Sequence, residues 1–271
     1  MHYVKSHGLG NDYIVIDPAK VPLRLTPEAV RLICDRHLGV GSDGILEVTA
    51  SGGADFGVRI FNPDGSVAEK SGNGIRIFAK YLREHGYTAE DRFTIDTAGG
   101  RVAVQLALRD GRVTEVTADM GRVTFGAIDS VEVNGTRLAV TSLSIGNPHC
   151  VVIVEDLAKI DPRRLGPLIE RHAAFPARTN VQFAQVRSRT EVAIEIWERG
   201  AGYTLASGTS SCAVAAAAHR KGLVDRVVSL WMPGGMLEVT VGEGYAMRLR
   251  GPVEEVTSGV FSADLLRRLR G

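Results

Sequence analysis

The sequence predicts a mixed α/β or α+β fold that is built from two similar domains. Short segments of alternating apolar and polar residues, which are typical of strands, outnumber the segments with helical spacing. One unit of helix, strand, turn and strand occurs twice along the chain. With 271 residues, the chain is also longer than the roughly 250 residues at which a single core usually stops growing. Two domains of similar size are therefore expected.

The individual elements are spread over both halves of the chain. Alternating residues predict strands at Val58–Ile60, Val102–Leu106, Val192–Ile196 and Leu237–Val241. Helical spacing or strong helix formers predict helices at Pro27–His37, Gly72–His85, Pro162–Ala173, Ser210–Lys221 and Ala263–Arg270. Because strands outnumber helices in both halves, each domain is expected to contain a sheet with few helices.

The internal repeat is centred on two Gly/Ser-rich helix starts. Ser71–Gly74 opens a helix that ends at Gly86, and Ser207–Ser210 opens one that ends at Gly222, so both ends are 136 residues apart. A strand, a Gly-Gly turn and an alternating strand follow each helix. This pattern predicts two pseudo-symmetric domains. They are expected at 1–119 and 120–259, with the last helix, 260–271, joined to the first domain.

Bulk properties point to a small-molecule partner. The formal net charge of +1 leaves no basic surface of the kind that nucleic acid or an anionic membrane requires. The cysteines, Cys34, Cys150 and Cys212, are odd in number and widely spaced, which argues against a disulfide framework. No CxxC or HExxH pattern predicts a metal, and no segment has the roughly 18 apolar residues of a membrane span. A soluble, cytoplasmic protein without metal is expected.

The two helix starts are suited to an anionic ligand. A helix N-terminus offers free N–H groups and the positive end of the helix dipole, and glycine lets a ligand approach the backbone. A carboxylate held there would make its α-carbon more acidic, and Ser71 and Ser207 would flank that carbon. Alternatively, both serines are only N-caps, or the repeat serves stability alone. Stability alone does not explain the glycines, which cost about 1 kcal/mol each inside a helix.

Several motifs together resemble those of the diaminopimelate epimerase family over nearly the whole chain. They are His7–Asp12, Arg36–Gly44, Asn62–Arg76, Gly146–Cys150, Thr179–Val181 and Glu198–Cys212. The resemblance implies two pseudo-symmetric domains, each a mostly antiparallel sheet wrapped around a central helix, with the active site between them. It also implies a homodimer that interconverts LL- and meso-diaminopimelate without pyridoxal phosphate or another cofactor, in lysine and peptidoglycan-precursor synthesis.

The resemblance also assigns roles to individual residues. In the family, two thiols at the helix starts remove and deliver the α-proton, and the matching positions here are Ser71 and Ser207. The distal end of the substrate would be bound by Asn62, Asn147, Asn180, Glu198 and Arg199, with Asn11 lining the site. The reacting carboxylate would lie on the backbone of Gly72, Asn73, Gly208 and Thr209. His149 is either a further lining residue or a structural histidine.

Serine at both thiol positions puts the family's chemistry in question. A thiol has an ordinary pKa of about 8.5, whereas an unassisted alcohol is far from ionising near neutral pH. Three interpretations stay open. The chain is an engineered double substitution, or a natural serine-bearing epimerase of diaminopimelate or another amino acid with a hydroxyl activated by a neighbour. In the third, it is a catalytically silent amino-acid-binding protein or a one-base dehydratase or isomerase of another amino acid. Lys70 and Ser210-Ser211 depart from the family pattern as well, which favours the natural serine-bearing form.

Two cysteines are candidates to replace the thiols that the family uses. Cys212 follows Ser207 by five residues, which turns it by about 140° around a helix, so it is expected to face the core. Cys150 follows His149 in a strand and would point to the opposite face. Neither cysteine is therefore expected to act as the base.

Overall fold

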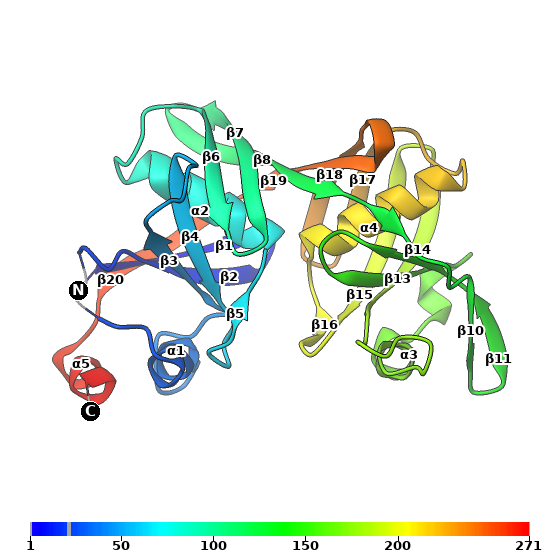
Figure 1. The fold of residues 1–271 in the computed structure, drawn as a ribbon, viewed down its shortest axis with the longest axis horizontal. Coiled ribbons are helices and arrows are strands. Elements are labelled where there is room, and N and C mark those ends of the chain that lie inside the picture. Colours follow the sequence, from blue (N-terminus) through cyan, green and yellow to red (C-terminus); the bar gives the residue numbers. More distant parts are fainter. Residues whose placement is uncertain (1, 21–22, 271) are drawn as a thin grey trace. The chain divides into compact units, whose positions relative to one another are not determined.

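The chain forms two compact units in a computed structural model that describes residues 2–20 and 23–270. Unit 1 contains the residues up to Ala118 and those from Pro252 onward, and unit 2 contains Asp119–Gly251. Both units combine a sheet with few helices (Figure 1), which confirms the predicted mixed α+β class. The second domain was predicted to extend to residue 259. In the structure, β20 (Glu254–Val260) pairs with β1 (His2–Gly8) and so belongs to unit 1.

Unit 1 contains a mixed sheet around one central helix. Its other strands are β2 (Asn11–Ile16), β3 (Ile45–Thr49), β4 (Phe56–Phe61), β5 (Val67–Ala68), β6 (Arg92–Thr97), β7 (Gly100–Arg109) and the first seven residues of β8 (Arg112–Arg122), which continues into unit 2. Pairing runs in the order β20-β1-β2-β3-β4-β6-β7-β8, and the β2–β3 and β4–β6 pairs are parallel. The helices are α1 (Pro27–Cys34), α2 (Gly72–Glu84) and α5 (Ala263–Arg270).

Unit 2 repeats this arrangement. Its strands are β9 (Thr124–Phe125), β10 (Ser130–Val133), β11 (Thr136–Ala139), β12 (Thr141–Ser144), β13 (Pro148–Ile153), β14 (Asn180–Ser188), β15 (Glu191–Glu198), β16 (Gly202–Thr204), β17 (Val227–Met232), β18 (Gly235–Val241) and β19 (Ala246–Pro252). The order is β9-β12-β13-β14-β15-β17-β18-β19, with β13–β14 and β15–β17 parallel. The helices are α3 (Pro162–Glu170) and α4 (Gly208–Arg220), with short 3₁₀ turns at Leu157–Lys159 and Glu243–Tyr245.

The strand registers of the two units correspond residue by residue. In unit 1, Ile45 lies opposite Ile14 on one side and Phe61 on the other. In unit 2, the residues 136 positions later, Cys150, Val181 and Trp197, are paired in the same way. The repeat in the sequence therefore reflects the same supersecondary unit folded twice, down to the pairing register of its central strands.

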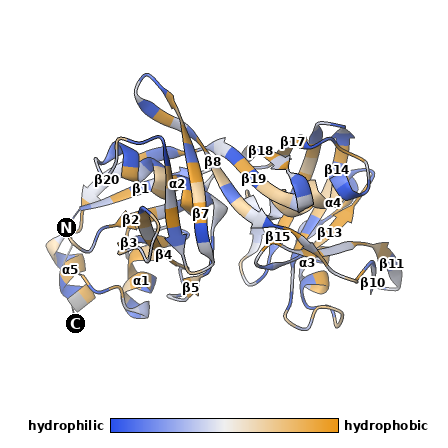
Figure 2. Ribbon diagram, turned by 45° about the horizontal axis from the view of Figure 1, so that its top comes forward, coloured by the Kyte–Doolittle hydropathy of each residue, from blue (hydrophilic) through white to orange (hydrophobic). Residues whose placement is uncertain are grey.

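The central helices are buried by the sheets around them. In α2, every residue from Gly72 to Leu82 is buried, and in α4 every residue from Gly208 to Ala218 is buried. The strands bury alternate side chains, as Val102, Val104 and Leu106 of β7 do. Figure 2 shows hydrophobic and hydrophilic residues interspersed along the strands. Since no side of these helices faces solvent over these residues, their starts are fixed in position relative to the strands of their own unit.

The predicted strands and Gly-Gly hairpins are confirmed, and three helix ends differ from prediction by two residues or more. Helix α1 ends at Cys34 rather than His37, because Asp35 has an extended backbone and its carboxylate accepts the N–H groups of His37 and Leu38. Helix α3 ends at Glu170, three residues early. Helix α4 begins at Gly208, two residues before the predicted start, because Ser207 caps it.

No helix within residues 2–20 and 23–270 is both long enough and apolar enough to cross a membrane. The longest helices are α2 and α4, with 13 residues each. A helix of that length spans only about 20 Å.

Gly44 lies where a side chain would meet the backbone of β4. A Cβ at this position would lie 2.4 Å from the Phe61 carbonyl oxygen and 2.6 Å from Cε1 of Tyr13. We expect Gly44→Ala to lower the free energy of unfolding by about 2 kcal/mol through this overpacking. The matched control is Gly52→Ala, whose Cβ would meet only the Asp96 side chain at 3.8 Å. Urea unfolding checks both variants, and equal stabilities would contradict the contact.

Candidate active site

In unit 1, Ser71 is the N-cap of α2. Its backbone is extended (φ −138°, ψ 118°), and its Oγ accepts a hydrogen bond from the Gly74 N–H at 3.0 Å. The Tyr13 hydroxyl lies 3.2 Å from the same oxygen. A cap of this kind contributes about 1 kcal/mol, so the structural role of Ser71 is real. Capping is not the only interaction of this hydroxyl, because Ser71 Oγ also forms a hydrogen bond with the Tyr13 hydroxyl.

Asn11 and Asn73 lie together at this helix start. Asn73 donates from Nδ2 to Oδ1 of Asn11 at 3.0 Å, and Asn11 donates in turn to the Asp43 carboxylate at 3.0 Å. Asn73 is 3% exposed. The Asp43 carboxylate therefore holds the amide of Asn11 in one orientation, and Asn11 orients Asn73.

A network of charged side chains lies next to Asn11 and Asn73. Asp12 is bonded to Arg36 and Lys5, each at 2.9 Å, and Arg36 also reaches Asp43 at 2.8 Å. Burial by itself would raise the pKa of Asp12, but the hydrogen bonds from Arg36 and Lys5 outweigh it and hold the pKa below its ordinary value. Asp12 is thus an anion at neutral pH, and it fixes the strand end that carries Asn11.

In unit 2, Ser207 caps α4 in the same way. Its backbone is extended (φ −147°, ψ 126°), and its Oγ accepts from the Ser210 N–H at 3.4 Å. Ser207 is 5% exposed, and Gly208, Thr209 and Ser210 behind it are buried as well. Both units therefore present a buried helix start that is capped by serine.

A second polar network lies beside α4. His149 bonds through Nε2 to Oδ1 of Asn147 at 2.9 Å and through Nδ1 to Nε2 of Gln182 at 3.1 Å. The Gln182 amide also donates to the Ser210 hydroxyl at 3.0 Å. Burial lowers the pKa of His149 to about 3, so the ring is neutral and can hold only one N–H. His149 thereby links Asn147 to the first turn of α4.

The remaining predicted binding residues lie at strand ends and turns. Asn180 donates to the Pro148 carbonyl at 2.8 Å and accepts from the Arg199 N–H at 3.0 Å, so these segments of unit 2 are held together. The Arg199 guanidinium donates to the Ala177 carbonyl at 3.3 Å, and Glu198 ends β15. Asn62 follows β4 in unit 1 and donates to Ser66 at 2.9 Å.

Several residues of these networks are not among the site residues predicted from the sequence. They are Tyr13, Asp12, Arg36, Asp43, Gln182 and Arg76, the last a fully buried arginine that donates to the Gly72 carbonyl. The signal that finds some of them is the 136-residue offset of the repeat. It pairs Asn11 with Asn147, Asn62 with Glu198, and Tyr13 with His149. Equivalent positions thus carry polar residues in both units, identical at Asn11 and Asn147 and different at the other two pairs.

The cysteines are all buried and free within the described residues. Cys150 packs in the apolar core of unit 2, and burial raises its pKa to about 12. Cys212 is fully buried, as predicted from its helical position. The Cys150 thiol is therefore not suited to act as a base near neutral pH, and the Cys212 side chain has no exposed surface. No group of His, Cys, Asp and Glu side chains in the described part of the chain is arranged to hold a metal ion.

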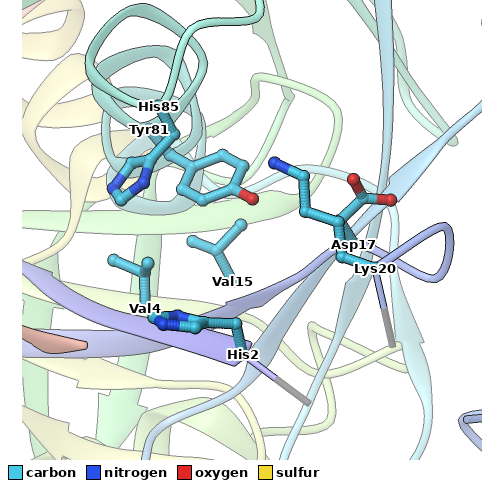
Figure 3. A pocket seen from close by; sticks show the side chains of 7 residues that line it. All are labelled: His2, Val4, Val15, Asp17, Lys20, Tyr81 and His85. Atoms are coloured by element: carbon cyan, nitrogen blue, oxygen red, sulfur yellow. The ribbon is translucent and has the colours of Figure 1, made fainter. Parts of the chain in front are cut away.

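A separate cavity of about 270 Å³ lies at the other end of α2 (Figure 3). Tyr81 and His85 from the last turns of the helix stack at 4.6 Å over it, and β1 and β2 supply most of the rest of its lining. The lining residues are His2, Val4, Val15, Asp17, Lys20, Tyr81 and His85. None of the predicted site residues lines this cavity, and Ser71 lies a full helix length away.

The fold is shared with solved racemases and epimerases. A hydroxyproline epimerase from Agrobacterium vitis, solved with trans-4-OH-L-proline, has a TM-score of 0.73 at 19% identity, covering 96% of this chain and 90% of that one. A PhzF-family phenazine biosynthesis protein from Bacillus anthracis has a TM-score of 0.74 at 17% identity, with 97% and 99% covered. These likenesses show that the chain shares its fold with both proteins.

Sequence comparison identifies the family. A family model described as diaminopimelate epimerase matches residues 3–126 and 141–253. Diaminopimelate epimerase 2 of Nostoc sp. is 44% identical, covering 98% of this chain and 97% of that protein. The diaminopimelate epimerase of Pelotomaculum thermopropionicum is 42% identical, with 96% and 99% covered. The chain belongs to the diaminopimelate epimerase family, which confirms the resemblance.

The network around Asp12 yields a stability prediction. We expect Asp12→Asn to lower the free energy of unfolding by about 2 kcal/mol at pH 7, because Lys5 and Arg36 lose a partly buried partner. Since folding lowers the pKa of Asp12, its contribution is present above the ordinary aspartate pKa of about 4 and is lost as the pH falls through the lowered value.

Urea unfolding at pH 7 and pH 3 measures this contribution. The difference between wild type and Asp12→Asn should shrink at pH 3. Asp91→Asn is the matched control, because the Asp91–Arg83 pair is more exposed and is worth under about 1 kcal/mol. A difference that grows with acidity would contradict the assignment of Asp12 as a stabilising anion.

Proposed function

We propose that this protein is a cofactor-independent amino-acid epimerase that interconverts LL- and meso-diaminopimelate, with Ser71 and Ser207 at the proton-transfer positions. The observation that carries the proposal is the pair of equivalent helix starts, each buried, rich in glycine and capped by a serine hydroxyl. Membership of the diaminopimelate epimerase family supplies the substrate. A cytoplasmic location and a homodimer are part of the same proposal and rest on the family.

The helix starts would bind the reacting carboxylate. Backbone N–H groups of Gly72 and Asn73 in α2, and of Gly208 and Thr209 in α4, have no intrahelical acceptor in the first turn. With the helix dipoles they would stabilise the negative charge that develops when the α-proton leaves. The two serine hydroxyls would remove the proton and return one to the α-carbon.

The other end of the substrate is a second amino-acid group, which carries both charges. We assign its recognition to Asn62, Asn147, Asn180, Glu198 and Arg199. The supporting observations are the hydrogen bonds that tie Asn180 to the Arg199 backbone and Asn147 to His149. On this proposal His149 is a neutral lining residue that orients Asn147, because its buried ring cannot carry a charge near neutral pH.

Two other functions are open to the same fold, and the product of the reaction distinguishes each of them from an epimerase. A silent binding protein would leave the α-proton in place, and a one-base dehydratase would release a keto product. The hydrogen bond between Ser71 and Tyr13 favours an active enzyme, because it gives one serine an ionisable neighbour.

The first test incubates the protein with LL- or meso-diaminopimelate in heavy water. Proton NMR then measures how fast the α-proton signal of each isomer disappears. We expect exchange with interconversion of the isomers, and a loss of about 100-fold in rate for Ser71→Ala and for Ser207→Ala. Thermal protection of the protein by both isomers without any exchange would establish a binding protein instead.

A second test restores the thiols. We expect the double variant Ser71→Cys/Ser207→Cys to exchange the α-proton at least about tenfold faster than wild type near pH 8, because a thiol ionises there and an alcohol does not. Ser188→Cys, at an exposed position, is the control for introducing a cysteine. A double variant that is no faster than wild type would contradict the assigned positions.

A further inference from the structure

We propose that Tyr13 is the proton partner of Ser71, so that the phenol and the alcohol work as one base. The inference rests on the proposed function, since it names how that reaction proceeds without a thiol. It is carried by the 3.2 Å hydrogen bond between the Tyr13 hydroxyl and Ser71 Oγ, both from elements of unit 1. Tyr13 is a positioning residue in this scheme, because it acts on the substrate through Ser71.

The surroundings hold the Tyr13 ring in place. Tyr13 is 7% exposed, and the backbone of Gly44 lies so close to the ring that a Cβ there would be 2.6 Å from Cε1. Its neighbour in β2, Asp12, is fixed by Arg36 and Lys5. The phenolic oxygen therefore has little freedom to leave the Ser71 hydroxyl.

A phenol is suited to the task that serine alone performs poorly. Tyrosine has an ordinary pKa of about 10, closer to neutral pH than that of an alcohol. The Gly74 N–H donates to Ser71 Oγ at 3.0 Å. Together with the α2 dipole, this hydrogen bond favours negative charge on the Ser71 and Tyr13 oxygens. The active form is the pair with one proton removed.

The proton transfer balances within the pair and the substrate. The α-proton passes to Ser71 Oγ, the Ser71 hydroxyl proton passes to the Tyr13 oxygen, and the phenolate becomes a phenol. The electron pair of the broken C–H bond stays on the substrate and is delocalised into its carboxylate. No further reactant is consumed.

The second helix start lacks this arrangement. His149 is the equivalent of Tyr13 by the 136-residue offset, but in the described structure its ring nitrogens bond to Asn147 and Gln182. Ser207 Oγ accepts the Ser210 N–H at 3.4 Å. The two serines are therefore unequal: Ser71 is the side that removes a proton readily, and Ser207 delivers one more readily than it removes one.

The experiment is a double-mutant cycle between Tyr13 and Ser71. Tyr13→Phe removes only the hydroxyl, and the α-proton exchange of diaminopimelate is followed by NMR. We expect it to slow exchange by at least about 100-fold in the native chain. In the Ser71→Cys background the loss should fall to about fivefold, because a thiol ionises without the phenol. Tyr81→Phe is the control, since its hydroxyl bonds to Tyr87 near the far end of α2.

The exchange rates of these variants decide between the role of Tyr13 and the alternatives. Equal losses in the two backgrounds, or no loss in the native chain, overturn the role of Tyr13, because a purely structural hydroxyl would not distinguish serine from cysteine. A native chain that exchanges nothing while the Ser71→Cys/Ser207→Cys form exchanges also overturns it and leaves the substrate assignment intact. Failure of both forms to exchange rejects the proposed function itself.

Discussion

The structure depends on how each unit encloses a helix that is buried from its first residue. The first turn of a helix has N–H groups without intrahelical acceptors, and burying them is costly unless something accepts from them. Ser71 and Ser207 each satisfy one such group with a side-chain oxygen. The other N–H groups of the first turn lie at the positive end of the helix dipole. The surrounding strands fix the position of this helix. On the proposed function, stability and carboxylate binding would come from the same backbone feature.

The repeat makes much of this arrangement predictable from sequence. The matched SGNG and SGTS segments predicted both central helices, and the corresponding registers of β3 and β14 show that the duplication extends to strand pairing. Helix ends were less predictable, since the early end of α1 depends on hydrogen bonds from Asp35 to the next turn. The Tyr13–Ser71 contact could not be predicted, because these residues lie 58 positions apart and meet only through the packing of α2 against β2.

The two halves differ where their chemistry would differ. The Leu46 side chain packs under Gly74 in unit 1, and the equivalent pair in unit 2 is Gln182 with Ser210, which form a hydrogen bond. The start of α2 therefore lies beside the Tyr13 hydroxyl and the apolar Leu46 side chain. The start of α4 lies beside the hydrogen-bond network of the neutral His149 ring. On the proposed function, the two serines would therefore be proton-transfer groups of different strength.

The most direct test of the account is whether both helix starts bind the same ligand. Titration of the isotope-labelled protein with meso-diaminopimelate, followed through the backbone amide signals of Gly72, Asn73, Gly208 and Thr209, reports on each start separately. The account predicts that all four signals shift with one common dissociation constant. Shifts confined to one helix, or two different dissociation constants, would contradict the claim that the two serine-capped helices serve one substrate.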